Sequence, residues 1–110
     1  ETVNFKVDPT IAAGSSANHD FTFSQASKIY QVFASASGKM KVEIQVESGA
    51  ATGVFTTIAV GFNSTSVPNI DITLNKYALV PAGARVRVIK TNRDLTAQDL
   101  YSTIVGILGT

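Results

Sequence analysis

The clearest pattern in the chain is a strict alternation of apolar and polar residues over positions 39–47. Met40, Val42, Ile44 and Val46 are apolar, and each of their neighbours is charged or carries an amide. Successive side chains of a strand point to opposite sides, so a period of two predicts a strand with one buried and one solvated face. A helix would spread the charged side chains around its whole circumference. We therefore predict a strand here.

Shorter runs follow the same rule and predict further strands. They cover positions 3–7, 21–23, 54–62, 70–74, 85–88 and the β-branched tail 101–108. In the run 54–62, we expect Val54, Thr56, Ile58, Val60 and Phe62 to share one face. The first run is expected to end at Pro9, because proline cannot donate to a strand ladder.

Turn-forming residues separate these runs at intervals of about ten positions. They cluster at positions 13–16, 37–38, 48–50, 63–66, 75–76, 80–83 and 91–94. About seven or eight short strands with this spacing are typical of two antiparallel sheets packed face to face. The prediction is an all-β, two-sheet sandwich or jelly roll that forms a single domain over residues 1–110, with one short helical turn at most.

Two windows allow both a strand and a helix. Positions 24–36 space their apolar residues as a helix does, with Ser24 as the N-cap, but positions 29–33 also have strand propensity. We favour a hairpin in which this strand leads through positions 37–38 into the strand at 39–47. In the second window, positions 94–104, we predict a helical turn over 95–99 followed by a strand.

The composition excludes several kinds of partner. Of the 110 residues, 45% are hydrophobic and only 15% are charged, and the formal net charge is +1. Basic residues form neither a stripe for nucleic acid nor a cluster for anionic lipid, so we expect neither nucleic acid nor membrane as a partner. No apolar run approaches the roughly 20 residues that span a bilayer. A surface poor in charge suits a protein that is partly covered by neighbours.

Cysteine is absent, so the chain forms no disulfide and no cysteine-based metal site. Stability must therefore come from packing. The chain begins with Glu1 rather than Met, which we interpret as processing or trimming.

Few residues suggest chemistry. His19 is the only histidine and Asp20 follows it, so a Ser-His-Asp set is one interpretation. A polar residue at the start of a strand is the favoured one, because neighbouring side chains of an extended chain point apart. Asp94 and Asp99 with Asn92 could offer oxygen atoms to calcium, but they lack the dense acidic spacing of a calcium loop. We expect no catalytic residue, no metal and no cofactor, and hence no enzyme.

The aromatic residues supply an alternative function. Tryptophan is absent, and Tyr30, Tyr77 and Tyr101 are the only tyrosines. Tyr77 and Tyr101 together could form a platform on which a sugar stacks. On this interpretation the domain is a carbohydrate-binding or adhesion module, such as a fibre tip or a lectin-like sandwich. The tripeptide at 63–65 matches the N-glycosylation pattern, which we interpret as a turn.

Two segments in the last third of the chain carry an overall resemblance. Positions 77–88 contain a Pro-Ala-Gly turn that feeds a strand, and positions 101–106 form a closing strand. Together they resemble small β-sandwich structural proteins of tailed-phage virions, in particular the decoration or cement proteins that clamp capsid subunits. The resemblance implies a non-enzymatic protein that caps symmetry-related sites on a capsid, often as a trimer. It transfers no functional residue, because it contains no diagnostic motif.

Both terminal stretches could add strands to a partner's sheet, so we expect the assembly contacts there. The expected contact residues are Val3, Phe5, Val7, Ile104, Val105 and Ile107. The expected function is that of a virion component, a capsid decoration or cement protein located on the extracellular particle. Its expected partners are capsid or other virion proteins and further copies of itself, with a trimer as the plausible homo-oligomer.

Overall fold

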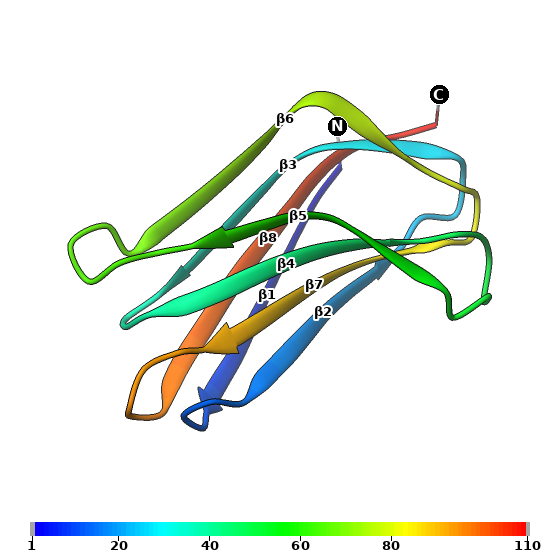
Figure 1. The fold of residues 1–110 in the computed structure, drawn as a ribbon. Helices are drawn as coiled ribbons and strands as arrows, with labels where there is room; N and C mark the ends of the chain where they lie inside the picture. The colour runs from blue at the N-terminus through cyan, green and yellow to red at the C-terminus, as the bar shows by residue number, and fades with distance from the viewer. Residues whose placement is uncertain (1, 110) are drawn as a thin grey trace.

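The structure, a computed structural model, describes residues 2–109 and consists of eight β-strands (Figure 1). In chain order they are β1 (Thr2–Ile11), β2 (Ser16–Thr22), β3 (Ser27–Ala36), β4 (Met40–Glu47), β5 (Phe55–Phe62), β6 (Asn69–Val80), β7 (Arg85–Asn92) and β8 (Gln98–Leu108). The predicted all-β class and the predicted number of strands are confirmed. No helix among the described residues is long and apolar enough to cross a membrane.

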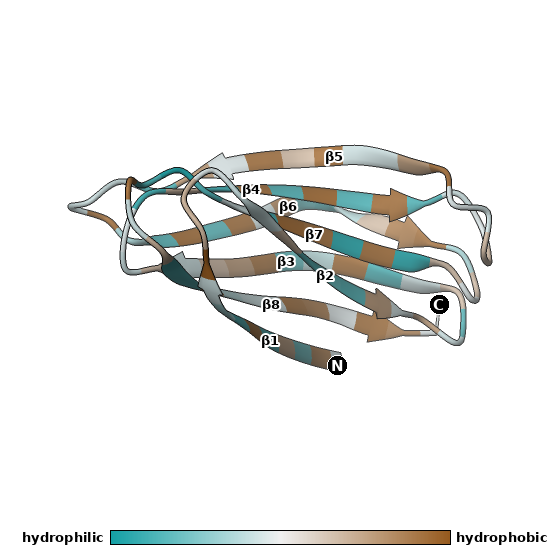
Figure 2. Ribbon diagram, turned by 90° about the horizontal axis from the view of Figure 1, so that it is seen from below, coloured by the Kyte–Doolittle hydropathy of each residue, from teal (hydrophilic) through white to brown (hydrophobic). Residues whose placement is uncertain are grey.

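The strands form two four-stranded antiparallel sheets that pack face to face (Figures 1 and 2). Sheet A has the order β1-β8-β3-β6, and sheet B has the order β2-β7-β4-β5. Among the eight strands of the described residues, only β4 and β5 are both consecutive in the chain and neighbours in a sheet, so each of the other six connections carries the chain across to the opposite sheet. This exchange is the arrangement of a jelly roll. Both termini lie at the same end of the molecule (Figure 1).

The core lies between the sheets and is built from alternate residues of the inner strands. Met40, Val42 and Ile44 of β4 and Val86 and Val88 of β7 are all completely buried. Figure 2 shows the corresponding alternation of hydrophobic and hydrophilic bands along β4 and β7. The strand predicted from the period of two at positions 39–47 is therefore confirmed.

The strand interpretation of positions 24–36 is confirmed, but the predicted hairpin is wrong. β3 pairs with β8 and β6 in sheet A, whereas β4 pairs with β7 and β5 in sheet B. The bend at Ser37 and Gly38 thus carries the chain from one sheet to the other. A side chain at Gly38 would clash with the Asp94 carboxylate, which explains the glycine at this crossing.

The predicted helical turn at 95–99 is also wrong, because the loop between β7 and β8 contains only bends. Asn92 organises this loop through its side-chain amide. Its Oδ1 accepts a hydrogen bond from the Asp94 N–H at 2.8 Å, and its Nδ2 donates to the carbonyls of Thr96 at 2.8 Å and Ile11 at 2.9 Å. A buried asparagine that bonds three backbone groups replaces the helical hydrogen bonds that the apolar spacing suggested.

The turn predicted at Asn75 and Lys76 lies instead inside β6. The pairing with β3 shifts there, since Ile29 is opposite Ala78 but Gln31 is opposite Thr73. The turn-forming residues therefore mark a wide bulge rather than the end of a strand. Bulges of this kind bend an edge strand and leave residues unpaired.

Pro9 does not end β1, contrary to the prediction. The strand continues to Ile11 through a shift in its pairing with β8 after Asp8. Thr10 takes a φ of 52°, which is an uncommon conformation for a β-branched residue. The Asp99 carboxylate accepts a hydrogen bond from the Thr10 N–H at 2.8 Å and so holds the bulge in place.

β5 turns the apolar residues that were predicted to share one face outward, away from the core. Val60 and Phe62 are exposed at 47% and 56%, and Ile58 lies at a register shift that breaks the alternation. Ala59 and Gly61 face inward instead. A Cβ at Gly61 would lie 3.0 Å from side-chain carbons of the β6 isoleucines, so small residues are needed where β5 and β6 meet.

Candidate functional site

The N-terminal strand β1 reverses the usual arrangement of a sandwich strand. Its apolar residues Val3 and Phe5 are each 58% exposed and Val7 is 39% exposed, whereas Asn4 and Asp8 are half-buried. Each exposed apolar side chain forgoes about 25 cal/mol of stabilisation for every Å² left in water. An exposed apolar row on a folded domain is the property expected of an interaction surface.

The inward side of β1 meets His19 of β2, which is 1% exposed. The Asn4 Oδ1 can only accept, so the His19 Nε2–H donates to it and the His19 Nδ1 accepts from the Ser102 hydroxyl at 2.7 Å. Burial lowers the pKa of His19 to about 4, and the positive charges of Lys90 and Lys6 contribute. His19 is therefore neutral at pH 7, with both ring nitrogens hydrogen-bonded.

Lys90 of β7 is the second polar group enclosed between the sheets. Its Nζ is fully covered and lies 2.7 Å from the Asp8 Oδ2. Lys6 binds the other carboxylate oxygen, Oδ1, at 3.1 Å and donates to the Asn18 carbonyl at 2.6 Å. Burial lowers the pKa of Lys90 against the attraction of Asp8. For Asp8, burial acts to raise the pKa, but the hydrogen bonds from both lysines outweigh it and the net pKa is lowered.

These side chains form one group, here called the inner polar cluster, which consists of Asn4, Lys6, Asp8, His19, Lys90 and Ser102. Its Ser102 and His19 are each 1% exposed and therefore closed to a substrate. Asp20, next to His19 in the chain, pairs with Arg87 instead, with the Arg87 Nε 2.8 Å from the Asp20 Oδ1. The structure thus does not bring a serine, His19 and Asp20 together. The absence of enzymatic activity stays a prediction.

Glu47 is the third buried polar group, on the strand face predicted to be solvated. It is completely buried, and it accepts hydrogen bonds from the Arg85 guanidinium at 2.9 and 3.2 Å. Its oxygens also accept from the backbone N–H groups of Arg85 at 3.0 Å and Gly53 at 2.8 Å. The Arg85 side chain, followed by the Gly53 N–H, holds the pKa of Glu47 at about 2. The strand period could not reveal this burial, because β5 and its loop provide it.

The carboxylates considered for calcium bind the backbone instead. The Asp94 carboxylate accepts hydrogen bonds from the N–H groups of Leu95 at 2.8 Å and Lys39 at 3.1 Å, and Asp99 binds Thr10. Across residues 2–109, no group of three or more His, Asp or Glu side chains is placed to hold a metal ion. These aspartates therefore stabilise loops and bulges.

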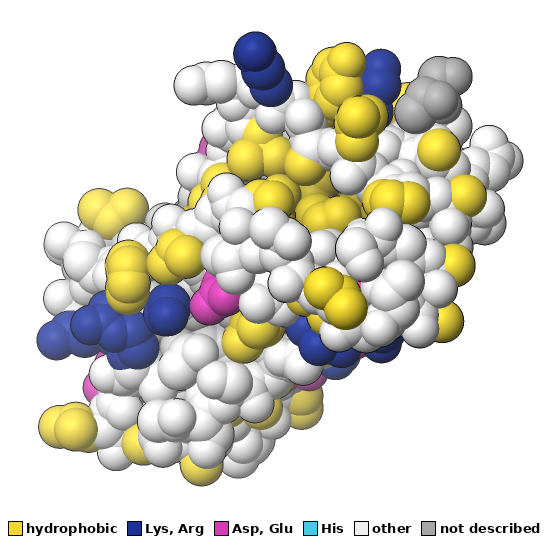
Figure 3. Space-filling model, turned by 45° about the vertical axis from the view of Figure 1, so that its right-hand side comes forward, with side chains coloured by type: hydrophobic (Ala, Val, Ile, Leu, Met, Phe, Trp, Pro, Cys, Tyr) yellow, Lys and Arg dark blue, Asp and Glu magenta, His cyan; other side chains and the backbone are white. Residues whose placement is uncertain are grey.

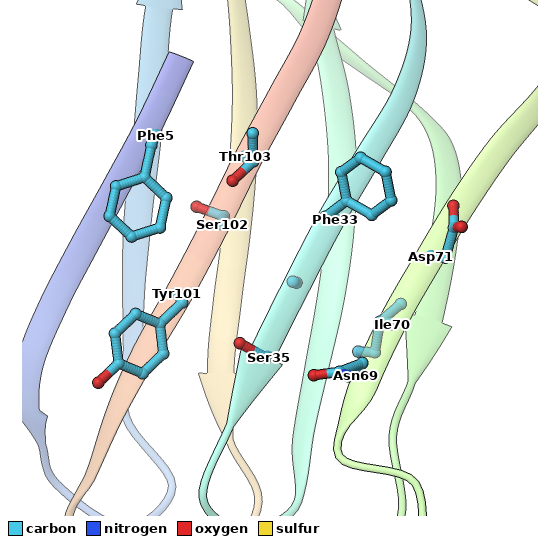
Figure 4. A pocket seen from close by; sticks show the side chains of 10 residues that line it. Phe5, Phe33, Ser35, Asn69, Ile70, Asp71, Tyr101, Ser102 and Thr103 are labelled. Atoms are coloured by element: carbon cyan, nitrogen blue, oxygen red, sulfur yellow. The ribbon is translucent and has the colours of Figure 1, made fainter. Parts of the chain in front are cut away.

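The outer face of sheet A carries a shallow depression of about 330 Å³ (Figure 4). The pairing of the strands places Phe5, Thr103, Phe33 and Asp71 in one row across the sheet, and Tyr101, Ser35 and Asn69 in the next row. We call these seven residues the aromatic depression. Figure 4 shows the rings of Phe5 and Tyr101 side by side, and their centroids lie 6.4 Å apart with an angle of 21° between the planes.

A second group of exposed apolar residues lies at the end of sheet A where the termini emerge. Leu79 and Ile107 are both paired with Lys28, one on each side of it. Val3 is paired with Val105, two positions before Ile107. We call Val3, Leu79, Ile107 and Leu108, all of which are exposed, the terminal patch. A depression of about 430 Å³ adjoins it, with Leu79 and Pro81 in its wall.

Not all of the predicted contact residues reach the surface. Val3, Phe5, Val7 and Ile107 are exposed, whereas Ile104 and Val105 are 1% and 7% exposed. Ile104 points into the core, so neither it nor Val105 presents its side chain to a partner. Buried and more exposed residues alternate along most of β8, and the sequence pattern alone did not show which of the predicted contact residues are buried.

The predicted platform of Tyr77 and Tyr101 is not assembled. Tyr101 is paired with Ser35 of β3. Tyr77 is next to Ala78, which is paired with Ile29, six positions before Ser35 on the same strand. Six residues of a strand span about 20 Å, too far for one sugar ring to touch both. Tyr101 has Phe5 as its neighbour instead, and the Lys28 Nζ lies 4.3 Å from the centroid of the Tyr77 ring.

The outer face of sheet B differs from that of sheet A because it is rich in charge. Lys41, Glu43 and Arg87 project from it, and Arg87 also covers the Phe55 ring at 4.1 Å. The face shown in Figure 3 carries basic side chains in separate groups, with apolar side chains concentrated over its upper part. The two faces of the sandwich are therefore suited to different surroundings.

The fold and these surfaces define the class of the protein, an eight-stranded, two-sheet β-sandwich with jelly-roll strand order. The crystal structure of PirA superposes on this chain with a TM-score of 0.52 at 9% sequence identity, over 94% of each chain. At that identity the likeness shows the fold alone. No family model matches the chain. No curated protein matches it either. The resemblance to phage decoration proteins stays a prediction.

Proposed function

We propose that this domain is a non-enzymatic structural protein that binds its neighbours in a larger assembly through the terminal patch. The assembly we propose is a virion, in which the domain would act as a capsid decoration or cement protein on the extracellular particle. Its partners would be capsid or other virion proteins and further copies of this chain, with a trimer as the expected oligomer. The burial of apolar surface, rather than a reaction, would be the source of its effect.

The observation that carries this proposal is the exposure of the terminal patch. Leu79 and Ile107 come from two strands that do not pair with each other, yet both side chains emerge on the same face of sheet A, at 65% and 47% exposure. The adjoining depression of about 430 Å³ offers a concave surface for a partner's side chain. A cluster of this kind costs stability in water and gains it on contact.

Deletion of the first seven residues would be a poor test, because β1 also carries Asn4 and Lys6 of the inner polar cluster. Substitutions of exposed side chains are sharper. We propose the double variant Leu79→Thr/Ile107→Thr, since threonine keeps the preference for a strand. The matched control is Leu95→Thr, which removes the most exposed large apolar side chain, at 93%, from the loop between β7 and β8.

Co-sedimentation with purified capsids of the phage that is proposed to encode the chain measures the contact with capsid proteins. Sedimentation equilibrium of the free chain measures the contact between copies of the chain. The wild-type chain and Leu95→Thr should bind capsids with equal affinity, and the double variant should bind at least ten-fold more weakly. Circular dichroism should show the same fold in all three. The proposal would be refuted if the wild-type chain stays monomeric and does not sediment with the capsids.

A further inference from the structure

We propose that the aromatic depression on sheet A is a binding site for a neutral saccharide. This function goes beyond assembly and uses a different surface. Tyr101 and Ile107 are six positions apart on β8, so these two residues lie about 20 Å from each other, whereas Val3 of the patch and Phe5 of the depression are neighbours on the outer side of β1. A domain fixed to an assembly through Leu79 and Ile107 would leave the part of the depression around Tyr101 and Asp71 accessible.

The apolar part of the site is the pair of rings formed by Phe5 and Tyr101. Figure 4 looks onto the outer face of sheet A and shows both rings side by side, with Phe33 across β8 from them. The planes of the Phe5 and Tyr101 rings differ by only 21°, so the faces of these two neighbouring rings point in nearly the same direction. The C–H groups on one face of a pyranose carry partial positive charge, which the negative face of an aromatic ring attracts.

The polar part of the site is a carboxylate that is already held in place. The Asp71 Oδ1 accepts hydrogen bonds from the Gln31 Nε2 at 3.1 Å and from the Thr73 hydroxyl at 3.0 Å. Because both bonds go to Oδ1, the carboxylate is oriented and Oδ2 can accept from a ligand hydroxyl. A charged acceptor makes stronger hydrogen bonds than a neutral one, which favours a ligand rich in hydroxyl groups.

Neighbouring side chains complete the hydrogen-bonding set. Asn69 provides both a donor and an acceptor, and the hydroxyls of Ser35 and Thr103 provide more of each. Figure 4 shows these three residues around the space between the Phe5–Tyr101 pair and Asp71. A few polar groups beside an apolar surface is the usual composition of a small-ligand site, and about 330 Å³ lies at the small end of the range for such sites.

The charge of the depression selects among saccharides. Among residues 2–109, Asp71 is the only charged residue that lines it, and neither lysine nor arginine does. Sialylated, sulfated and phosphorylated sugars would place a negative charge near Asp71 without a cation to balance it. The depression is therefore complementary to neutral hexoses and their short oligomers.

An array of neutral and acidic oligosaccharides gives the first test. NMR titration with methyl glycosides of glucose, galactose, mannose and N-acetylglucosamine then gives affinities and locates the shifted amides. We expect binding of at least one neutral sugar, with shifts at Phe33, Asp71 and Thr103. Tyr101→Ala and Asp71→Asn should each weaken it at least ten-fold, whereas Tyr77→Ala, an equally aromatic change outside the depression, should leave it unchanged.

Three results would each overturn the inference: no neutral sugar bound at millimolar concentration, binding to acidic sugars only, or binding that both Tyr101→Ala and Asp71→Asn leave intact. The Leu79→Thr/Ile107→Thr variant should bind the sugar as the wild-type chain does. Loss of capsid binding in that variant with sugar binding retained would separate the two functions. A failure of one proposal therefore leaves the other open to its own test.

Discussion

At the scale of single residues, buried polar groups determine how stability depends on pH. The pKa of His19 is lowered to about 4 in the folded chain from an ordinary 6.5. Between these two values the unfolded chain binds more protons than the folded chain, so the free energy of unfolding falls as pH falls. The full difference corresponds to roughly 3 kcal/mol of stability, present above pH 6.5 and lost on the way to pH 4.

Urea unfolding at neutral pH and at about pH 4.5 measures this effect, because most carboxylates stay ionised over that window. The wild-type chain should lose most of the His19 contribution between the two conditions. His19→Gln retains a donor and an acceptor but does not titrate, so its unfolding free energy should change much less. An equal loss of unfolding free energy in the two proteins would mean that folding does not lower the pKa of His19.

Glu47 gives a second prediction at this scale. Its carboxylate accepts bonds from the Arg85 side chain and from two backbone N–H groups, and its pKa of about 2 shows how strongly the charged form is preferred. Glu47→Gln should therefore lower the urea midpoint clearly at pH 7. Glu43→Gln, on the same strand and face but partly exposed, is the matched control and should change it little. Equal midpoints for the two variants would contradict the assigned role.

At the scale of the strands, the sequence predicts where apolar and polar residues alternate, but not which of the two faces of a strand points into the core. β4 was predicted correctly in position and, apart from Glu47, in face, because its alternate residues are strongly polar and sheet A packs against only one side of it. β1 and β5 have the same alternation with the apolar residues facing out. Both are edge strands, and the inward polar residues of β1 find partners in His19 and Lys90. Those partners lie far away in the sequence, so no local pattern reveals them.

The pairing of Asp8 with Lys90 allows a test of why β1 is oriented this way. Asp8→Ala leaves the fully covered Lys90 Nζ without its carboxylate at 2.7 Å, which should cost about 3–5 kcal/mol. The double variant Asp8→Ala/Lys90→Met removes both charges and should recover most of that loss. Thermal and urea unfolding at pH 7 measure both. A double variant as unstable as Asp8→Ala alone would mean that the charge pair does not hold β1 in place.

At the scale of the whole molecule, the jelly-roll strand order assembles sites that no segment of the sequence contains. The aromatic depression combines β1, β8, β3 and β6, and the terminal patch combines β1, β6 and β8. The sequence did indicate that Phe5 and Tyr101 could be exposed. It could not indicate that they lie together, because strand order and register follow from the pairing of distant strands.

The strand order also predicts which backbone amides exchange most slowly with solvent. β8 and β3 in sheet A and β7 and β4 in sheet B each have a neighbour on both sides, so all their N–H groups can be hydrogen-bonded. Edge strands bond only alternate N–H groups, so β1, β2, β5 and β6 should show slow and fast amides in turn. Hydrogen exchange followed by NMR measures this directly. Continuous protection over Lys41–Val46 with a period of two over Val3–Val7 is the expected result. Fast exchange throughout β4 would contradict the central position of that strand, and with it the packing of the two sheets.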